Sequence, residues 1–145
     1  MLHDMDKYPG YWIRKVFRIM NVVYDRELAK YDLTSSQISV LCNLWNKDGI
    51  TQKEMQEKLN LRAASVTGLV DTLCDKNFIT RIQDDEDARV KRLYLTDKGR
   101  KVEKISTDVV KVLESTISKG LTEDEKIIFV SWLKKAHNNF YSMNK

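Results

Sequence analysis

The stretch that decides the fold is residues 85–99, which read DEDARVKRLYLTDKG. An acidic run ends at Arg89, alternating apolar and polar residues follow, and the stretch closes on Leu95-Thr96-x-x-Gly99. Alternation with a period of two indicates a half-buried strand. We therefore expect the return strand of a β-hairpin, here called the wing, which leads directly into a long helix.

The other arm of the hairpin is predicted at residues 78–83, FITRIQ, which include β-branched residues and alternate in polarity. Residues 84–88 form the predicted turn, and Val90, Leu93 and Leu95 are placed in the return strand.

Helix starts are marked by three capping boxes, in which a threonine stands three residues before Glu or Gln. The threonines are Thr34, Thr51 and Thr122. A further helix is predicted over about residues 62–76, with Asn60 as its N-cap. Asn77 can adopt the left-handed conformation that ends this helix.

The outer helices are strongly apolar. A helix predicted from Pro9 to about Tyr31 is apolar over more than one face, which requires burial from two sides and predicts a second subunit. Another helix starts near Asp97 and ends at Gly120. Residues assigned to buried positions on the last helix and in the core are Ile128, Phe129, Leu133, Ala136, Phe140, Trp45 and Trp132.

The order of elements is four helices, a hairpin and two helices, so the predicted fold is mainly α with a small β-hairpin (α+β). Residues 33–96 form a winged helix-turn-helix in this scheme. Residues 1–32 and 97–145 form N- and C-terminal dimerisation helices.

The composition is that of a folded, helix-rich protein, with 42% hydrophobic and 32% charged residues. No run approaches the roughly 20 apolar residues of a membrane span. No secretory signal is visible, and the low cysteine content suits a reducing compartment. We therefore expect a cytoplasmic protein without a membrane partner. The net charge of +4 favours a polyanionic partner only mildly.

The helix at residues 62–76 follows a short helix and a brief turn, which is the spacing of a helix-turn-helix. The second helix of that motif enters a DNA major groove. Its outward face would present Arg62, Ala63, Ser65, Thr67, Gly68 and Thr72. Arg62 can reach a guanine or a phosphate, and the hydroxyls can donate hydrogen bonds. The small Ala63 and Gly68 allow close approach. The alternative is a plain solvated helix surface.

The wing places Arg89 at its turn, where Asp87 can brace the guanidinium. An arginine held in this way suits a narrow minor groove, where the potential is most negative. Lys91 can add a phosphate contact, and Arg81 of the first strand completes the predicted DNA-binding set. The alternative is an exposed turn with a local ion pair, which adds little stability.

At these residues the chain resembles the MarR family of winged-helix transcriptional regulators. The resemblance rests on residues 65–73 (SVTGLVDTL), Phe78-Ile79-Thr80-Arg81, the Asp87-x-Arg89 wing and Leu95-Thr96-x-x-Gly99. It implies a homodimer held by the outer helices, with two winged regions reading a near-palindromic site on double-stranded DNA. It also implies a repressor or activator that responds to a small aromatic or phenolic effector, or to oxidants.

The chain departs from the family pattern in its charges. Gly68 and Thr72 stand where many members carry arginine, and Ala88 replaces a second wing arginine. Residues 61–77 hold two basic and two acidic residues, and residues 78–95 hold four of each. We therefore expect affinity to depend on positioned contacts and dimer avidity, with Arg89 contributing an unusual share.

Effector binding, which the resemblance implies, would draw on Tyr11, Trp12 and Lys15 for aromatic and cationic contacts to a carboxylate. The same residues suit core and surface positions of a dimer helix. Redox sensing is not expected, because Cys42 lies on an apolar stripe and Cys74 lies beside an aspartate near a helix end. The sequence has no metal-ligand spacing, cofactor motif or catalytic constellation, so no metal, cofactor or enzyme activity is predicted.

The sequence thus predicts a sequence-specific DNA-binding transcriptional regulator, a ligand-responsive repressor that acts as a homodimer. The alternative is a winged-helix module that binds a protein partner without duplex DNA specificity.

Overall fold

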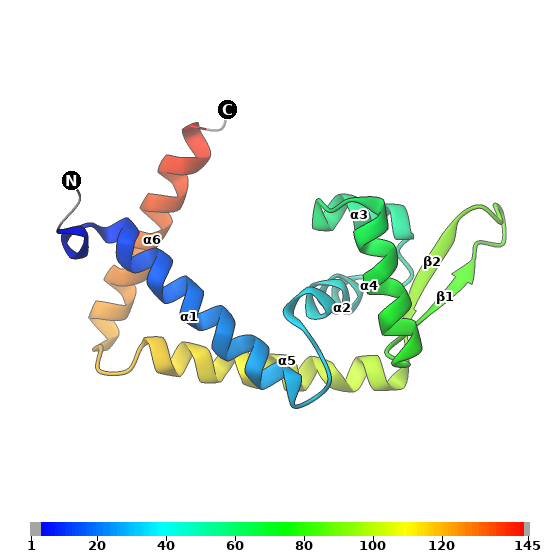
Figure 1. Ribbon diagram of the computed structural model, residues 1–145, viewed down its shortest axis with the longest axis horizontal. Coiled ribbons are helices and arrows are strands. Elements are labelled where there is room, and N and C mark those ends of the chain that lie inside the picture. The colour runs from blue at the N-terminus through cyan, green and yellow to red at the C-terminus, as the bar shows by residue number, and fades with distance from the viewer. Residues whose placement is uncertain (1–3, 144–145) are drawn as a thin grey trace. The chain divides into compact units, whose positions relative to one another are not determined.

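The computed structural model describes residues 4–143, and Figure 1 shows the order of the elements. The elements are η1 (Met5–Lys7), α1 (Pro9–Ala29), α2 (Ser35–Asn46), α3 (Gln52–Leu59), α4 (Ala63–Asp75), β1 (Ile79–Gln83), β2 (Lys91–Leu95), α5 (Asp97–Ile117) and α6 (Glu123–Met143). The strands pair antiparallel, with Ile79 opposite Leu95 and Gln83 opposite Lys91. The predicted class, mainly α with one small hairpin, is confirmed.

All three predicted capping boxes are present. Thr34, Thr51 and Thr122 each accept a hydrogen bond from the backbone N–H three residues later. The Gln or Glu side chain at that later position accepts one in return from the threonine N–H. These reciprocal bonds fix the starts of α2, α3 and α6.

Two of these caps make stability depend on pH. Hydrogen bonds from threonine N–H groups lower the pKa of Glu54 and of Glu125 below the usual 4.5. Their contribution to stability is therefore present above about pH 4.5 and is lost as pH falls through the folded-state pKa. We expect the melting temperature to decrease as the pH is lowered below about 4.5. Glu54→Gln should make this decrease smaller, because a neutral amide oxygen still accepts the hydrogen bond. Thermal unfolding across acid pH measures this, and an identical acid profile in the variant would contradict it.

Asn60 does not cap α4, which corrects the prediction. It adopts the left-handed conformation at φ 51° and ends α3, where its N–H bonds to carbonyls of the last turn. The N-cap of α4 is Arg62, whose side chain makes no capping bond. The short turn between α3 and α4 needs a residue with a positive φ to reverse the chain, and asparagine tolerates that conformation well. Asn77, at φ 61°, ends α4 as predicted.

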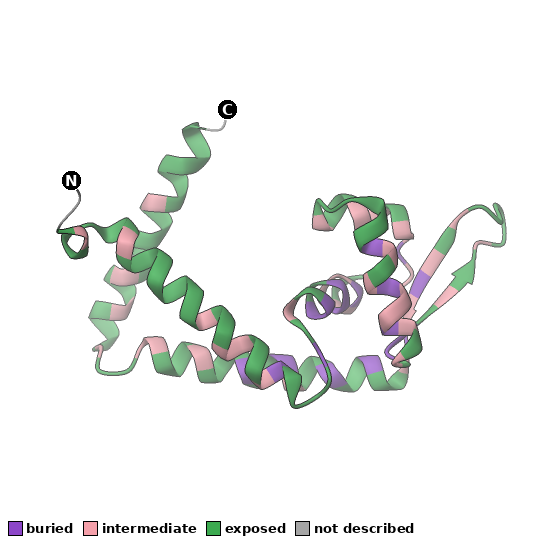
Figure 2. Ribbon diagram, viewed as in Figure 1, coloured by how far each residue is buried: buried purple, intermediate pink, exposed green. Residues whose placement is uncertain are grey.

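Residues 4–111 form one compact unit, and residues 112–143 form a second. The core of the first unit is drawn mainly from α2, α4, the hairpin and α5, with Met55 from α3 (Figure 2). Its largest buried side chains are Phe78, Leu28, Leu41, Leu44, Ile50, Met55, Leu73, Ile79 and Leu93. Trp45 packs against this core as predicted, and its indole N–H donates to the Gly99 carbonyl at 3.0 Å.

The outer helices keep most of their apolar side chains exposed within the single chain. α1 buries only Leu28, and α6 buries no residue. The predicted burial along α6 is therefore not observed: Phe140 is 70% exposed, and Trp132, assigned to the core, is 64% exposed. A helix that is apolar around most of its circumference needs neighbours on several sides. No helix within residues 4–143 is both long and apolar enough to cross a membrane.

The junction between the hairpin and α5 is packed at backbone distance. The Thr96 hydroxyl points to the carbonyl oxygens of Asn77 and Phe78, at 2.7 and 3.0 Å, and accepts a hydrogen bond from the Gly99 N–H at 3.0 Å. A Cβ on Gly99 would lie 2.1 Å from the Phe78 carbonyl oxygen. The Leu95-Thr96-x-x-Gly99 pattern is thus a joint that ties the wing to α5.

Candidate nucleic-acid interface

The outward face of α4 is small and open. Val66, Val70 and Leu73 are buried, so the start of the helix exposes Arg62, Ala63, Ala64, Ser65 and Gly68. A Cβ on Gly68 would meet no atom within 4 Å. Short side chains on such a face let a helix backbone approach base edges closely.

Two of the predicted contacts on α4 are engaged within the fold. The Thr67 hydroxyl accepts a hydrogen bond from the Gln52 amide at 3.0 Å, which leaves its own proton available. The Thr72 hydroxyl donates to the Gly68 carbonyl at 2.9 Å, so its proton is used by its own helix. Ser65 therefore provides the most accessible hydroxyl of the predicted set.

The wing turn holds Arg89 differently from the prediction. The Asp87 carboxylate accepts a hydrogen bond from the backbone N–H of Arg89 at 2.9 Å and does not bind the guanidinium. A short aspartate side chain reaches the N–H two residues on within a turn, which makes this the local choice. Asp87 thus fixes the backbone that carries Arg89. The exposed guanidinium makes no hydrogen bond or ion pair with residues 4–143.

Two arginines of the hairpin are engaged in ion pairs. Arg81 Nη2 lies 2.7 Å from a carboxylate oxygen of Asp71 on α4. Arg92 Nε lies 2.5 Å from Asp84, and this guanidinium lowers the pKa of the Asp84 carboxyl. Neither arginine projects freely from the hairpin, although Arg81 was predicted to contact DNA.

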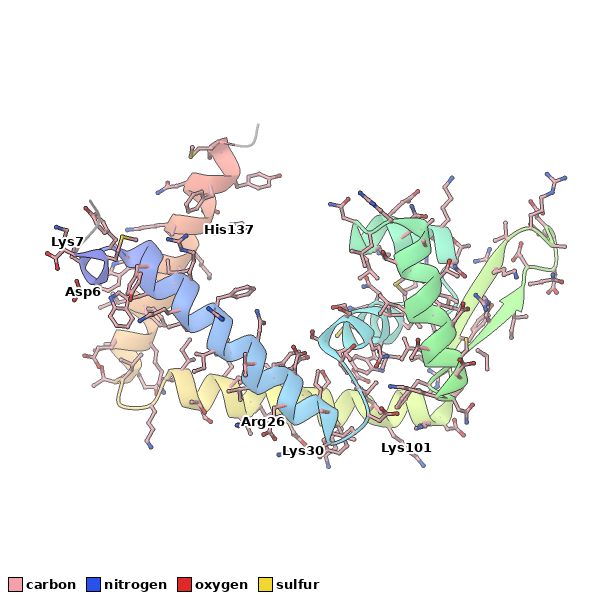
Figure 3. All side chains as sticks on the ribbon, viewed as in Figure 1. Asp6, Lys7, Arg26, Lys30, Lys101 and His137 are labelled. Carbon is pink, nitrogen blue, oxygen red and sulfur yellow. The ribbon has the colours of Figure 1, made fainter. Side chains whose placement is uncertain are left out.

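The free positive charge of residues 61–95 is concentrated at two places. Of the cations in that range, those without an ion pair to the described residues are Arg62, Arg89 and Lys91. Arg62 precedes α4, and the other two lie at the wing. The balanced charge count therefore conceals an exposed cation at the helix start and two at the hairpin. By contrast, Arg26 in the last turns of α1 (Figure 3) lies 3.8 Å from Glu27.

A cleft of about 560 Å³ separates the helix start from the wing. Its walls come from α3, the start of α4 and the hairpin, and they include Gln52, Lys53, Ala63, Thr67, Arg89 and Lys91. Arg81 also lines the cleft, so four of the lining side chains are cationic. A cleft with a helix on one side and a basic hairpin on the other suits the sugar–phosphate backbone that separates two DNA grooves.

Known proteins are similar to this chain in sequence and in fold. The family model described as MarR family matches residues 33–91. The HTH-type transcriptional regulator YpoP of Bacillus subtilis is 31% identical over 106 residues, which cover 70% of this chain and 69% of YpoP. The chain belongs to the MarR family.

Solved structures of the family agree with the fold. Apo MarR of Escherichia coli is similar with a TM-score of 0.77 and 26% identity, over 89% of this chain and 96% of that one. A cysteine-to-serine mutant of E. coli MarR complexed with operator DNA is similar with a TM-score of 0.74 and 26% identity, over 94% and 98%.

Sequence reasoning missed three residues of this candidate interface. Ala64 is exposed on the outward face of α4, and its spacing of four from Gly68 could have revealed it. Gln52 and Lys53 line the cleft from α3. The contact of Gln52 with Thr67 joins residues 15 apart in sequence, and no local pattern signals it.

The predicted effector residues lie together in the first turns of α1. The Lys15 ammonium stands 4.7 Å from the centre of the Tyr11 ring and 5.4 Å from that of Trp12. The Trp12 indole N–H donates to the Asp6 carbonyl at 2.6 Å. This cluster brings aromatic faces and a cation together, which is what contacts to an aromatic carboxylate need. Its role in effector binding stays a prediction for this MarR-family chain.

The cysteines are poorly suited to redox chemistry. Burial is the largest cause that raises the pKa of Cys42 and of Cys74, and both pack against the core. A raised pKa keeps a thiol protonated and weakly nucleophilic. Among residues 4–143, no group of three or more His, Cys, Asp or Glu side chains is placed to hold a metal ion.

Proposed function

We propose that this MarR-family chain is a sequence-specific transcriptional regulator that reads a near-palindromic site on double-stranded DNA as a homodimer. The observation that carries the proposal is the pairing of the open α4 face with the unpaired Arg89 guanidinium across one basic cleft. A recognition helix in the major groove, with a wing arginine in the neighbouring minor groove, requires that arrangement.

Contacts divide between the two grooves and the backbone between them. The start of α4, with Arg62, Ala64 and Ser65, faces base edges. Lys53 and Lys91 line the cleft and supply phosphate contacts. Arg89 enters the minor groove, where a narrow A·T-rich tract gives the most negative potential.

Dimerisation is supported by the apolar side chains that α1 and α6 leave exposed. Phe17 and Val22 of α1 are 65% and 62% exposed, and Ile127 of α6 is 68% exposed. Such surfaces are typical of subunit interfaces. Residues 1–32 and 97–145 form the dimerisation region in this proposal, and residues 33–96 form the DNA-binding region. Two winged regions then meet half-sites about one helical turn apart.

We further infer that the regulator is a cytoplasmic repressor that a small aromatic or phenolic effector releases from DNA. Family membership supports this, together with the cluster of Tyr11, Trp12 and Lys15. Adding aromatic acids to the protein–operator complex should lower its affinity.

The test selects bound duplexes from a random pool and measures affinity for the selected duplex as salt is raised. We expect a palindromic consensus and an affinity that falls steeply, with a logarithmic slope of about −0.9 per phosphate contacted. Sedimentation of the free protein should give a dimer. Failure to select any consensus, with no salt-sensitive binding, would contradict the proposal.

The second candidate is a winged-helix module that binds a protein partner. The equal counts of acidic and basic residues in residues 61–95 favour it. The two functions predict different results in the same selection, because a protein-binding module would not retain duplexes.

A further inference from the structure

Four side chains join the three elements that enclose the cleft. Gln52 of α3 donates to the Thr67 hydroxyl of α4 at 3.0 Å, and its amide oxygen lies 3.5 Å from Arg81 Nη1 of β1. Arg81 Nη2 donates to the Asp71 carboxylate of α4 at 2.7 Å. We call Gln52, Thr67, Asp71 and Arg81 the wing–helix bridge.

The bridge lies between the two parts that would contact DNA. Thr67 and Asp71 follow the exposed start of α4, and Arg81 stands in the middle of β1, opposite Leu93. From Arg81 the strand runs to the turn that carries Arg89. An ion pair at this point limits how far the hairpin can swing away from α4.

We propose that Arg81 is a positioning residue that holds the hairpin at the separation from α4 needed for both to contact one half-site. This inference rests on the proposed DNA-binding function. It also assigns Arg81 a role other than the direct DNA contact predicted from the sequence.

The guanidinium of Arg81 lines the cleft but is already engaged within the fold. Its two terminal nitrogens already face Asp71 and Gln52, and its side chain is only 28% exposed. A phosphate that drew the guanidinium away from Asp71 would leave an uncompensated carboxylate on the helix nearest the DNA. Keeping the pair both neutralises Asp71 and fixes the hairpin.

The test is a double-mutant cycle on the selected operator, with Asp71→Asn, Arg81→Gln and the two combined. We expect each single variant to lower the affinity for the operator roughly three- to tenfold. The double variant should bind no worse than the weaker-binding single variant, because coupled residues do not give additive losses. Arg89→Ala should cost less in the Asp71→Asn background than in the wild type. Melting temperatures should change little, because a partly exposed ion pair adds little stability.

Salt dependence separates positioning from direct contact. Arg81→Gln should keep the wild-type salt slope, whereas Lys91→Ala, as the matched phosphate-contact control, should reduce it by about 1. Additive losses in the cycle, or a slope reduced by about 1 in Arg81→Gln, would assign Arg81 to the DNA and overturn the inference.

A measurement without DNA tests the same geometry. Spin labels at cysteines introduced by Ala64→Cys and Ala88→Cys, with Cys42 and Cys74 replaced by alanine, report the separation of α4 and the wing. We expect Asp71→Asn to broaden the distance distribution. An unchanged distribution would overturn the positioning role. If wild-type protein binds no duplex while the distribution does broaden, the proposed function fails and the bridge stands as a hinge restraint only.

Discussion

Replacing Arg89 with alanine is expected to lower operator affinity at least tenfold, about 1.4 kcal/mol or more. The Arg89 guanidinium is exposed and makes no hydrogen bond or ion pair within residues 4–143. The variant therefore disturbs nothing that holds the hairpin. The hydrogen bond to the Asp87 carboxylate comes from the backbone N–H of residue 89, which alanine retains. A gel shift or fluorescence anisotropy titration on the selected operator measures the loss.

The matched control is Arg26→Ala, which removes the same charge from α1. Because exposed charges far from the interface add only a screened, general attraction, this control should bind almost as the wild type does. Equal binding by Arg89→Ala and the wild type would refute the minor-groove role of the wing.

Replacing Gly99 with alanine is expected to destabilise the protein by about 1–3 kcal/mol or more, the cost of forcing an atom into a packed interior. The added Cβ would lie 2.1 Å from the Phe78 carbonyl oxygen, which is backbone and cannot rotate away. Either the start of α5 moves, or the end of α4 and the first residue of β1 move. Chemical denaturation followed by circular dichroism measures the change.

The control for Gly99 is Gly68→Ala, which also replaces a helical glycine. Its Cβ would meet no atom within 4 Å, so the variant should gain up to about 1 kcal/mol from helix propensity. Opposite signs for the two variants would show that close packing decides the effect. A Gly99→Ala variant as stable as the wild type would mean that the wing–α5 joint is looser than described.

Local chemistry made much of the fold predictable. Each of the capping boxes, which begin at Thr34, Thr51 and Thr122, spans only four residues, so the sequence alone located three helix starts. The alternation around Leu93 located the return strand in the same way. The predicted role of Asn60 was wrong, because asparagine suits both a helix start and a left-handed helix end, and only the short turn decides between them.

The partners of individual charged groups were not predictable. Arg81 finds Asp71 ten residues away, and Arg92 finds Asp84 across the hairpin turn. These choices depend on strand register and on helix rotation, which a count of charges does not contain. The bond of Asp87 to a backbone N–H, in place of a guanidinium, is a similar case. The exposed apolar side chains of α6 reflect a surface that one chain leaves uncovered.

The most direct test of the account is hydroxyl-radical footprinting of the selected operator with wild-type protein and with Arg89→Ala. Two winged regions of a homodimer should protect two tracts symmetric about the centre of the palindrome, with half-sites about one helical turn apart. The account predicts minor-groove protection beside each half-site that disappears in Arg89→Ala at protein concentrations that still saturate the operator. A single unpaired tract, or minor-groove protection that persists in the variant, would contradict it.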